Sequence, residues 1–155
     1  MYIVFVALSM VVLPVASILV NLAHVPDAGL MELLGRWFVF WGVGVRLGVA
    51  GLRQFLWPKL TATEVFHMTS DQALPVIREL GIANVGTAVI ALTSLAIPGF
   101  VLPAALSAGI FYGMAAVGHI AEPNRSLNEN VALWSDLFLF SVLLAVVVAA
   151  VAGMV

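Results

Sequence analysis

Hydrophobic positions fall into five long blocks along the chain, separated by short polar stretches. A helix needs about 20 mostly apolar residues to cross a bilayer. Five stretches reach that length: residues 2–23, 36–57, 74–97, 100–121 and 131–155. Backbone groups in lipid must bond within their own segment, and no block alternates as a barrel strand would. The pattern predicts an all-α transmembrane helical bundle of five helices, or four if the first block is absent or re-entrant, in a single domain over residues 1–155.

The composition narrows the class of protein further. Hydrophobic residues make up 63% of the chain and charged residues only 9%, with a mean hydropathy of +1.16. A soluble domain carries about 25% charged residues. The net charge of −2 leaves no basic surface for nucleic acid. The absence of cysteine excludes disulfides, thiolate metal ligands and thiol redox chemistry carried by this chain.

The ends of the blocks predict an orientation in the membrane. No basic stretch precedes the first block and no A-x-A-like site follows it, which favours a retained helix over a cleaved signal peptide. Four basic residues lie on or near the side shared by the N-terminus, namely Arg53, Lys59, Arg78 and Arg125, against Arg36 on the other. The positive-inside rule therefore predicts a multi-pass protein of the cell (inner) membrane with a cytoplasmic N-terminus.

The second block combines a glycine face with two arginines. Gly44, Gly48 and Gly51 fall on one side of a helix, in the small-xxx-small pattern that lets helices pack closely. Arg46 and Arg53 lie roughly opposite that face. An arginine at a helix centre costs about 2.5–3.5 kcal/mol on insertion scales. Arg53 can extend toward the membrane boundary near Trp57 and Lys59, whereas the deeper Arg46 needs a partner. That partner is either a carboxylate that fixes the helix register or an anionic ligand.

The third and fourth blocks carry an acid, an amide and a histidine. Glu79 opens the third block on the face of Ala83, and we expect its carboxylate to meet a packed neighbour, with an arginine as one partner. Asn84 points elsewhere and suits a hydrogen bond between helices. His119 ends the fourth block as the one histidine within a membrane segment, which argues against bis-histidine haem and against a histidine-rich metal site. We therefore predict no metal ligands.

The last block adds Asp136, two turns into a helix that Asn128 precedes and caps. Because helix direction alternates, five polar residues are expected near one leaflet: Arg53, Glu79, His119, Asn128 and Asp136. The sequence thus predicts one polar pocket opening toward the long loop. Such a pocket could bind a small anion, relay protons or hold a cation, and Asp136 could equally be a counter-ion to Arg46 or Arg53.

No catalytic signature appears in the chain. The sequence has no G-x-S-x-G, Walker loop, H-E-x-x-H or dinucleotide fingerprint. The glycines of residues 42–51 do not match a phosphate loop, because no strand precedes them. Whether the protein is an enzyme and whether it holds a cofactor are both left undecided.

Several motifs together resemble a family of small multi-pass prokaryotic membrane proteins of unknown function. These motifs are Glu79-x-Gly-x-Ala-Asn84, Gly-His119, and Asn128 with Asp136 eight residues later. The resemblance implies that Glu79, Asn84, His119, Asn128 and Asp136 form a common polar core. This chain departs from it at Asn130, where the family usually has glycine. A fainter likeness to DoxX-like membrane proteins, which are four-helix bundles linked to redox partners, comes from the stretch at residues 46–52.

Three functions remain open on these observations. The first is an intramembrane pocket for a small molecule, lipid headgroup or ion, in a carrier or binding subunit. The second is an accessory subunit of a larger membrane redox complex, and the third is an enzyme acting on a lipid-soluble substrate. A bundle of five helices is small for alternating access and shows no inverted repeat. Homodimerisation through the glycine face would ease that difficulty.

Overall fold

The computed structural model describes residues 2–65, 68 and 70–153, and all regular structure in these residues is helical. Residues 154 and 155, the end of the fifth predicted block, lie outside this range. The helices, in chain order, are α1 Tyr2–Ala7, α2 Leu13–His24, α3 Leu30–Phe38, α4 Arg46–Leu56, α5 Pro58–Glu64, α6 Leu74–Thr93, α7 Val101–Ala121 and α8 Leu127–Val151. π-Helical segments at Leu8–Val12 and Val39–Val45 join α1 to α2 and α3 to α4.

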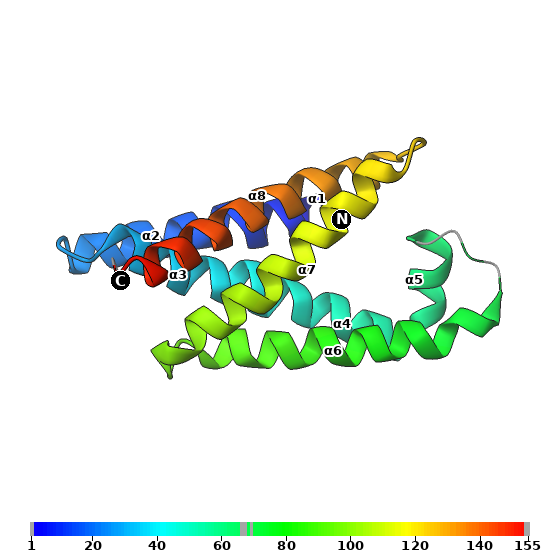
Figure 1. Cartoon of the computed structure of the whole chain (residues 1–155), viewed down its shortest axis with the longest axis horizontal. Coiled ribbons are helices and arrows are strands. Elements are labelled where there is room, and N and C mark those ends of the chain that lie inside the picture. The colour runs from blue at the N-terminus through cyan, green and yellow to red at the C-terminus, as the bar shows by residue number, and fades with distance from the viewer. Residues whose placement is uncertain (1, 66–67, 69, 154–155) are drawn as a thin grey trace.

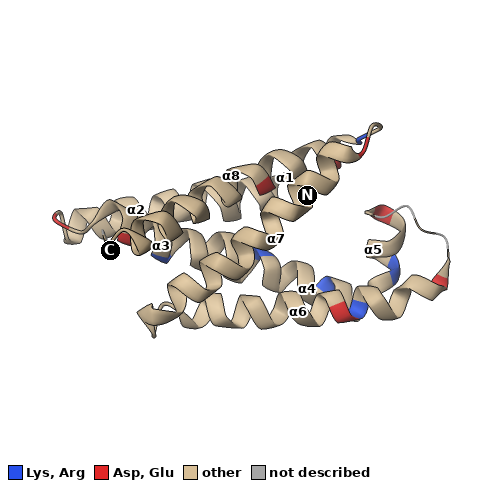
Figure 2. Ribbon diagram, in the orientation of Figure 1, with Lys and Arg blue, Asp and Glu red and all other residues tan. Residues whose placement is uncertain are grey.

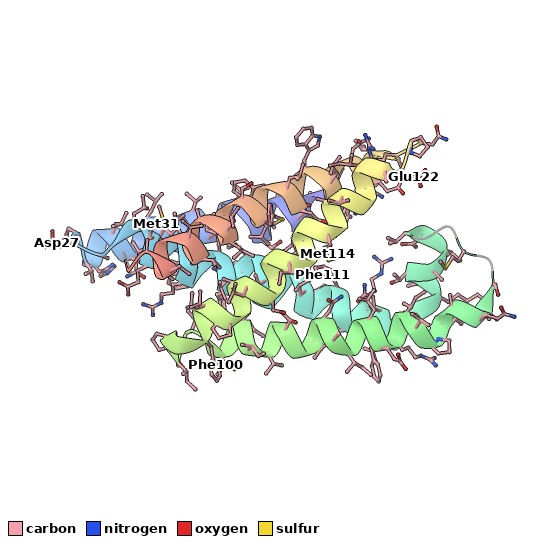
Figure 3. All side chains as sticks on the ribbon, in the orientation of Figure 1. Asp27, Met31, Phe100, Phe111, Met114 and Glu122 are labelled. Atoms are coloured by element: carbon pink, nitrogen blue, oxygen red, sulfur yellow. The ribbon has the colours of Figure 1, made fainter. Side chains whose placement is uncertain are left out.

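Five continuous helices are long and apolar enough to cross a membrane: Tyr2–His24, Leu30–Leu56, Asp71–Thr93, Pro98–Ala121 and Leu127–Val151. The predicted all-α bundle with five membrane-spanning helices is therefore confirmed. The second helix begins six residues before the predicted block, because the stretch after Gly29 continues into it. Many large apolar side chains face outward, such as Met114 on α7, as expected for surfaces in contact with lipid (Figure 3).

The helices form two close pairs that diverge toward one end of the molecule (Figure 1). One pair consists of α4 and α6, and the other consists of α7 and α8, with α1 to α3 lying along α8. A core of buried hydrophobic residues holds the helices together. It includes Phe38, Val43, Tyr112, Leu139 and Leu143. The charged residues lie mainly near the two ends, with a few further along the helices (Figure 2).

The predicted glycine face packs against α6 of the same chain. An added Cβ on Gly51 would lie 2.7 Å from the carbonyl oxygen of Gly81, and one on Gly44 would lie 2.8 Å from a Leu92 methyl carbon. At Gly48 the nearest atom is the Ala88 Cβ, at an ordinary 3.5 Å. This intrachain contact occupies the face that we expected to be free for homodimerisation.

Two local elements were not predicted from the sequence. Helix α5 occupies part of the long polar loop, with Pro58 as its first residue and Thr61 and Ala62 buried. In the π-helical segment Val39–Val45, the amide of Arg46 bonds to the carbonyl of Trp41 five residues back. This wider turn changes which face of α4 each later residue occupies.

Helix α8 begins at a capping box rather than at an Asn128 cap. Ser126 accepts a hydrogen bond from the Glu129 amide, and the Glu129 carboxylate accepts one from the Ser126 amide. The sequence interpretation placed the cap two residues too late, because Asn and Ser are both good capping residues. Asn128 lies instead within the first turn and is exposed.

Ser126→Ala should destabilise the start of α8 by about 1 kcal/mol, because one amide loses its capping acceptor. Hydrogen exchange of the amides over residues 127–130 would detect the fraying. Ser141→Ala is the matched control, since that hydroxyl only donates to the Leu137 carbonyl in the middle of the same helix. Equal exchange in the two variants would contradict a stabilising role for the capping box.

Candidate functional site

A buried ion pair joins the two helix pairs near the middle of the bundle. Arg46 Nη2 on α4 lies 2.9 Å from Asp136 Oδ1 and 2.9 Å from Ser135 Oγ on α8. Both charged side chains are at most 10% exposed. At 1.5 Å rise per residue, Arg46 lies roughly 15 Å from the end of α4 and Asp136 roughly 14 Å from the start of α8. The pair therefore lies near the centre of a hydrocarbon layer about 30 Å thick.

Tyr112 of α7 holds the guanidinium from a second side. The Arg46 Cζ lies 4.9 Å from the centroid of the Tyr112 ring, in a cation–π contact. The Tyr112 hydroxyl donates a hydrogen bond of 2.9 Å to the carbonyl of Gly42, within the π-helical segment. This bond satisfies a fully buried hydroxyl and fixes the ring against Arg46, so Tyr112 positions the pair.

His119 connects this pair to the end of the bundle. Its Nε2 lies 3.8 Å from Asp136 Oδ2, the carboxylate oxygen that does not contact Arg46. The His119 side chain is 24% exposed and lies two residues before the end of α7. Arg125 Nη1 donates to the carbonyls of His119, Ile120 and Glu122 and so closes the end of this helix. One carboxylate is thus shared between a central guanidinium and an imidazole close to the loop.

The Arg46 guanidinium is only partly satisfied. Its Nη1 is buried and has no hydrogen-bond acceptor among the residues that the structure describes. Leaving a buried donor unpaired costs about 1–3 kcal/mol, more for a charged group. The Tyr112 ring contact offsets part of this cost, and Arg46 remains the least satisfied polar side chain of the site.

The other residues of the predicted pocket lie apart from this cluster in the described part of the chain. Arg53 of α4 forms an exposed ion pair with Glu64 of α5. Asn84 bonds through Nδ2 to Gln54 Oε1 at 2.8 Å and ties α6 to α4. Glu79 is exposed on α6, and Asn128 is exposed at the start of α8.

Glu79 requires a correction to its predicted environment. We expected its carboxylate to face a packed neighbour on the side of the helix that carries Ala83, and helical spacing puts Gly86 and Ile90 on that side as well. All four residues are exposed, because α6 turns the opposite face, containing Gly81 and Asn84, toward α4. The glycines at the crossing of the two helices, rather than the polar residues, determine which face is covered.

Two members of the observed site were missed by sequence reasoning. Tyr112 shares a helix face with His119, but nothing in the local sequence indicates that an arginine from another helix lies over its ring. Ser135 precedes Asp136 directly and looks like an ordinary serine of a membrane helix. Its hydroxyl also donates to the Ala132 carbonyl, which leaves its oxygen lone pairs for Arg46. No group of three His, Cys, Asp or Glu residues in the described part of the chain is arranged to hold a metal ion.

The fold and this site define a multi-pass membrane protein with a buried charged pair inside its helical bundle. The chain belongs to DUF6790, a family of unknown function, which it matches over residues 3–154. The predicted resemblance to an uncharacterised membrane family is confirmed by this match, whereas the likeness to DoxX-like proteins is not shown. No curated protein matches the chain. No solved structure matches it either.

Proposed function

We propose that this protein is a proton-coupled membrane carrier or binding subunit in which His119 and Asp136 hold the proton. The observation that supports the proposal is the position of the Asp136 carboxylate. It lies between the Arg46 guanidinium of one helix pair and the His119 imidazole of the other. Ionisable groups inside membrane bundles commonly mark ion pathways and proton relays.

The proposed mechanism is competition for one carboxylate. Histidine is the side chain whose charge ordinarily changes between about pH 5 and 8. A proton on His119 strengthens its attraction to Asp136, which weakens the hold of Asp136 on Arg46. Since Arg46 is on α4 and Asp136 is on α8, the α4–α6 pair then loses a contact to the α7–α8 pair.

The remaining groups around His119 are compatible with this role. Arg125 contacts its backbone carbonyl, and Arg46 bonds to Asp136, the carboxylate that His119 approaches. Of the three uses left open by the sequence, a proton requires the least space. A small anion at Arg46 would need space beside its unpaired nitrogen, which is buried, and a metal ion would need further ligands beside the His119–Asp136 pair.

We further propose that the proton comes from the cytoplasm. The connections between α4 and α6 and between α7 and α8 contain Lys59 and Arg125 and lie toward the end of the molecule where α1 begins (Figure 1). Basic residues favour the cytoplasmic side of the inner membrane. His119 lies close to this end, so its access to water would be cytoplasmic.

Spin labels on the two helix pairs test the proposal. The chain has no cysteine, so Val76→Cys on α6 and Leu127→Cys on α8 can be labelled selectively, and both positions are exposed. Pulsed electron paramagnetic resonance in lipid nanodiscs should give a longer distance at pH 5 than at pH 8. His119→Gln and Asp136→Asn should each abolish this difference, because either change removes the proton-dependent competition.

Glu79→Gln is the matched control, since it neutralises an exposed carboxylate outside the cluster and should retain the pH effect. An unchanged distance between pH 8 and pH 5 in the otherwise unaltered protein would overturn the proposal. A pH effect that survives both His119→Gln and Asp136→Asn would overturn it as well.

One alternative function has specific support. In it the protein is an accessory subunit, and the contacts of Arg46 only hold the helices of the bundle together. Arg46 bonds directly to both Ser135 and Asp136 and packs against Tyr112, which is a well-fixed arrangement. A rigid bundle with no response to pH, recovered from membranes in a stable complex with another protein, would favour this alternative.

A further inference from the structure

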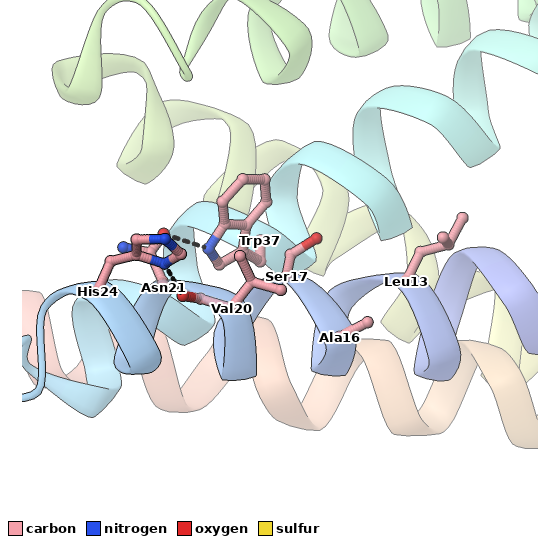
Figure 4. A pocket seen from close by; sticks show the side chains of 7 residues that line it. All are labelled: Leu13, Ala16, Ser17, Val20, Asn21, His24 and Trp37. Carbon is pink, nitrogen blue, oxygen red and sulfur yellow. Dashed lines mark hydrogen bonds between the residues drawn. The ribbon is translucent and has the colours of Figure 1, made fainter.

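A groove lies along α2, and none of its lining residues belongs to the cluster of Arg46, Tyr112, His119 and Asp136. It has a volume of about 420 Å³ and is lined by Leu13, Ala16, Ser17, Val20, Asn21, His24 and Trp37 (Figure 4). This volume lies within the range of about 300–1,000 Å³ typical of small-molecule sites. The groove is open to the surface of the bundle, on a helix that is long and apolar enough to lie in lipid.

The length of the groove matches one leaflet of a bilayer. Leu13 and His24 are the first and last of the 12 residues of α2, and the distance between them at 1.5 Å rise per residue is roughly 16 Å. Half of a hydrocarbon layer about 30 Å thick is roughly 15 Å. The groove therefore runs from the middle of the membrane, where the Tyr2–His24 helix has its centre, to the boundary at His24.

The polarity of the lining changes along the same direction. Leu13, Ala16 and Val20 supply an apolar surface toward the membrane centre. Ser17 lies among them, and its hydroxyl oxygen accepts a hydrogen bond of 3.0 Å from Trp41 Nε1. Asn21 and His24 supply polar groups at the boundary, beside the indole of Trp37 (Figure 4). This order, apolar inside and polar outside, is the order of groups along a membrane lipid.

The hydrogen bonds at the polar end involve Asn21, His24 and Trp37. Trp37 Nε1 donates to Asn21 Oδ1 at 3.1 Å, so the Asn21 oxygen is used and its amide nitrogen is not. Among the described residues, none accepts a hydrogen bond from that nitrogen. His24 Nδ1 donates to the Val20 carbonyl at 2.8 Å, and the Arg36 guanidinium lies 5.3 Å from the Trp37 ring centroid.

From this geometry we infer that the groove binds one acyl chain of a phospholipid, with the glycerol ester and phosphate groups at Asn21 and Arg36. Ester carbonyls and phosphate oxygens accept hydrogen bonds, and the groove offers an amide donor and a nearby guanidinium. The apolar part of the groove, toward the membrane centre, takes the acyl chain within one leaflet. This site is separate from the His119–Asp136 pair and does not depend on the proposed function.

A photoreactive phospholipid tests the inference. The probe is a phosphatidylglycerol with a diazirine in the middle of one acyl chain, added to nanodiscs that contain the full protein. Mass spectrometry should place most of its cross-links on residues 13–20 of α2. Ala16→Trp should reduce these cross-links at least fivefold, because the indole fills the groove, and Ala16 is exposed, so the fold is retained.

Val15→Trp is the matched control, since Val15 is exposed on the same helix but does not line the groove. It should leave the groove cross-links unchanged. Cross-links spread evenly around α2, or unaffected by Ala16→Trp, would overturn the inference in favour of ordinary solvation by lipid. Protein–protein cross-links between groove residues would overturn it in favour of a second copy of the chain.

Discussion

Asp136→Leu is expected to cost the folded bundle about 3–5 kcal/mol, because it leaves the Arg46 guanidinium buried without a counter-charge. The pair lies near the membrane centre, where Arg46 already has one nitrogen without an acceptor. Unfolding by SDS in mixed micelles, followed by circular dichroism, would measure the loss. The milder Asp136→Asn keeps an oxygen for Arg46 and should cost less.

The double variant Arg46→Met with Asp136→Leu separates the effect of an orphaned charge from the value of the pair. Replacing both partners by apolar side chains should restore stability to within about 1–2 kcal/mol of the unaltered protein, since buried ion pairs are often nearly neutral against apolar replacements. A double variant as unstable as Asp136→Leu would contradict this account. It would show that the pair contributes stability of its own.

Gly51→Ala should destabilise the α4–α6 pair by about 2 kcal/mol or more, and Gly51→Leu should prevent the two helices from pairing. An added Cβ on Gly51 lies 2.7 Å from the Gly81 carbonyl oxygen and 2.9 Å from the Val85 amide nitrogen. Both contacts are with backbone, so no side chain can move aside and the helices themselves must separate. Overpacking of this kind typically costs about 1–3 kcal/mol.

Gly48→Ala is the control for this prediction, because Gly48 is one turn earlier on the same face. Its added Cβ would meet only the Ala88 Cβ at 3.5 Å, which is ordinary contact. The SDS unfolding midpoint of Gly48→Ala should therefore stay close to that of the unaltered protein. Equal destabilisation of the two variants would show that the close approach at Gly51 is not what limits packing.

The sequence predicts the helices and the glycine contact well, for a physical reason. Crossing a bilayer imposes a length and an apolar composition that can be read directly from the chain. Small residues at helical spacing in turn identify a face that a neighbour can approach. Gly44, Gly48 and Gly51 follow this rule, and the contact partner is α6.

The partners of the polar residues could be predicted only in part. Arg46 with Asp136 was one of the pairings considered, and the structure forms it. Arg53 instead bonds to Glu64, because the polar loop folds into α5 and brings that carboxylate back to α4. The position of α5 depends on the buried residues Thr61 and Ala62. This helix has only 7 residues, which is too short for a recognisable hydrophobic period in the sequence.

The π-helical segment Val39–Val45 also sets a limit on how the length of this chain can vary. An α-helix turns about 100° per residue, so adding or removing one residue between Phe38 and Arg46 rotates the rest of the helix by about that angle. Gly51 would then leave the Gly81 backbone and Arg46 would leave Asp136 together. A relative with one residue fewer here can keep both contacts only by replacing the wide turn with regular α-helix. Alignments of this family should therefore place their gaps in the second membrane helix at this segment.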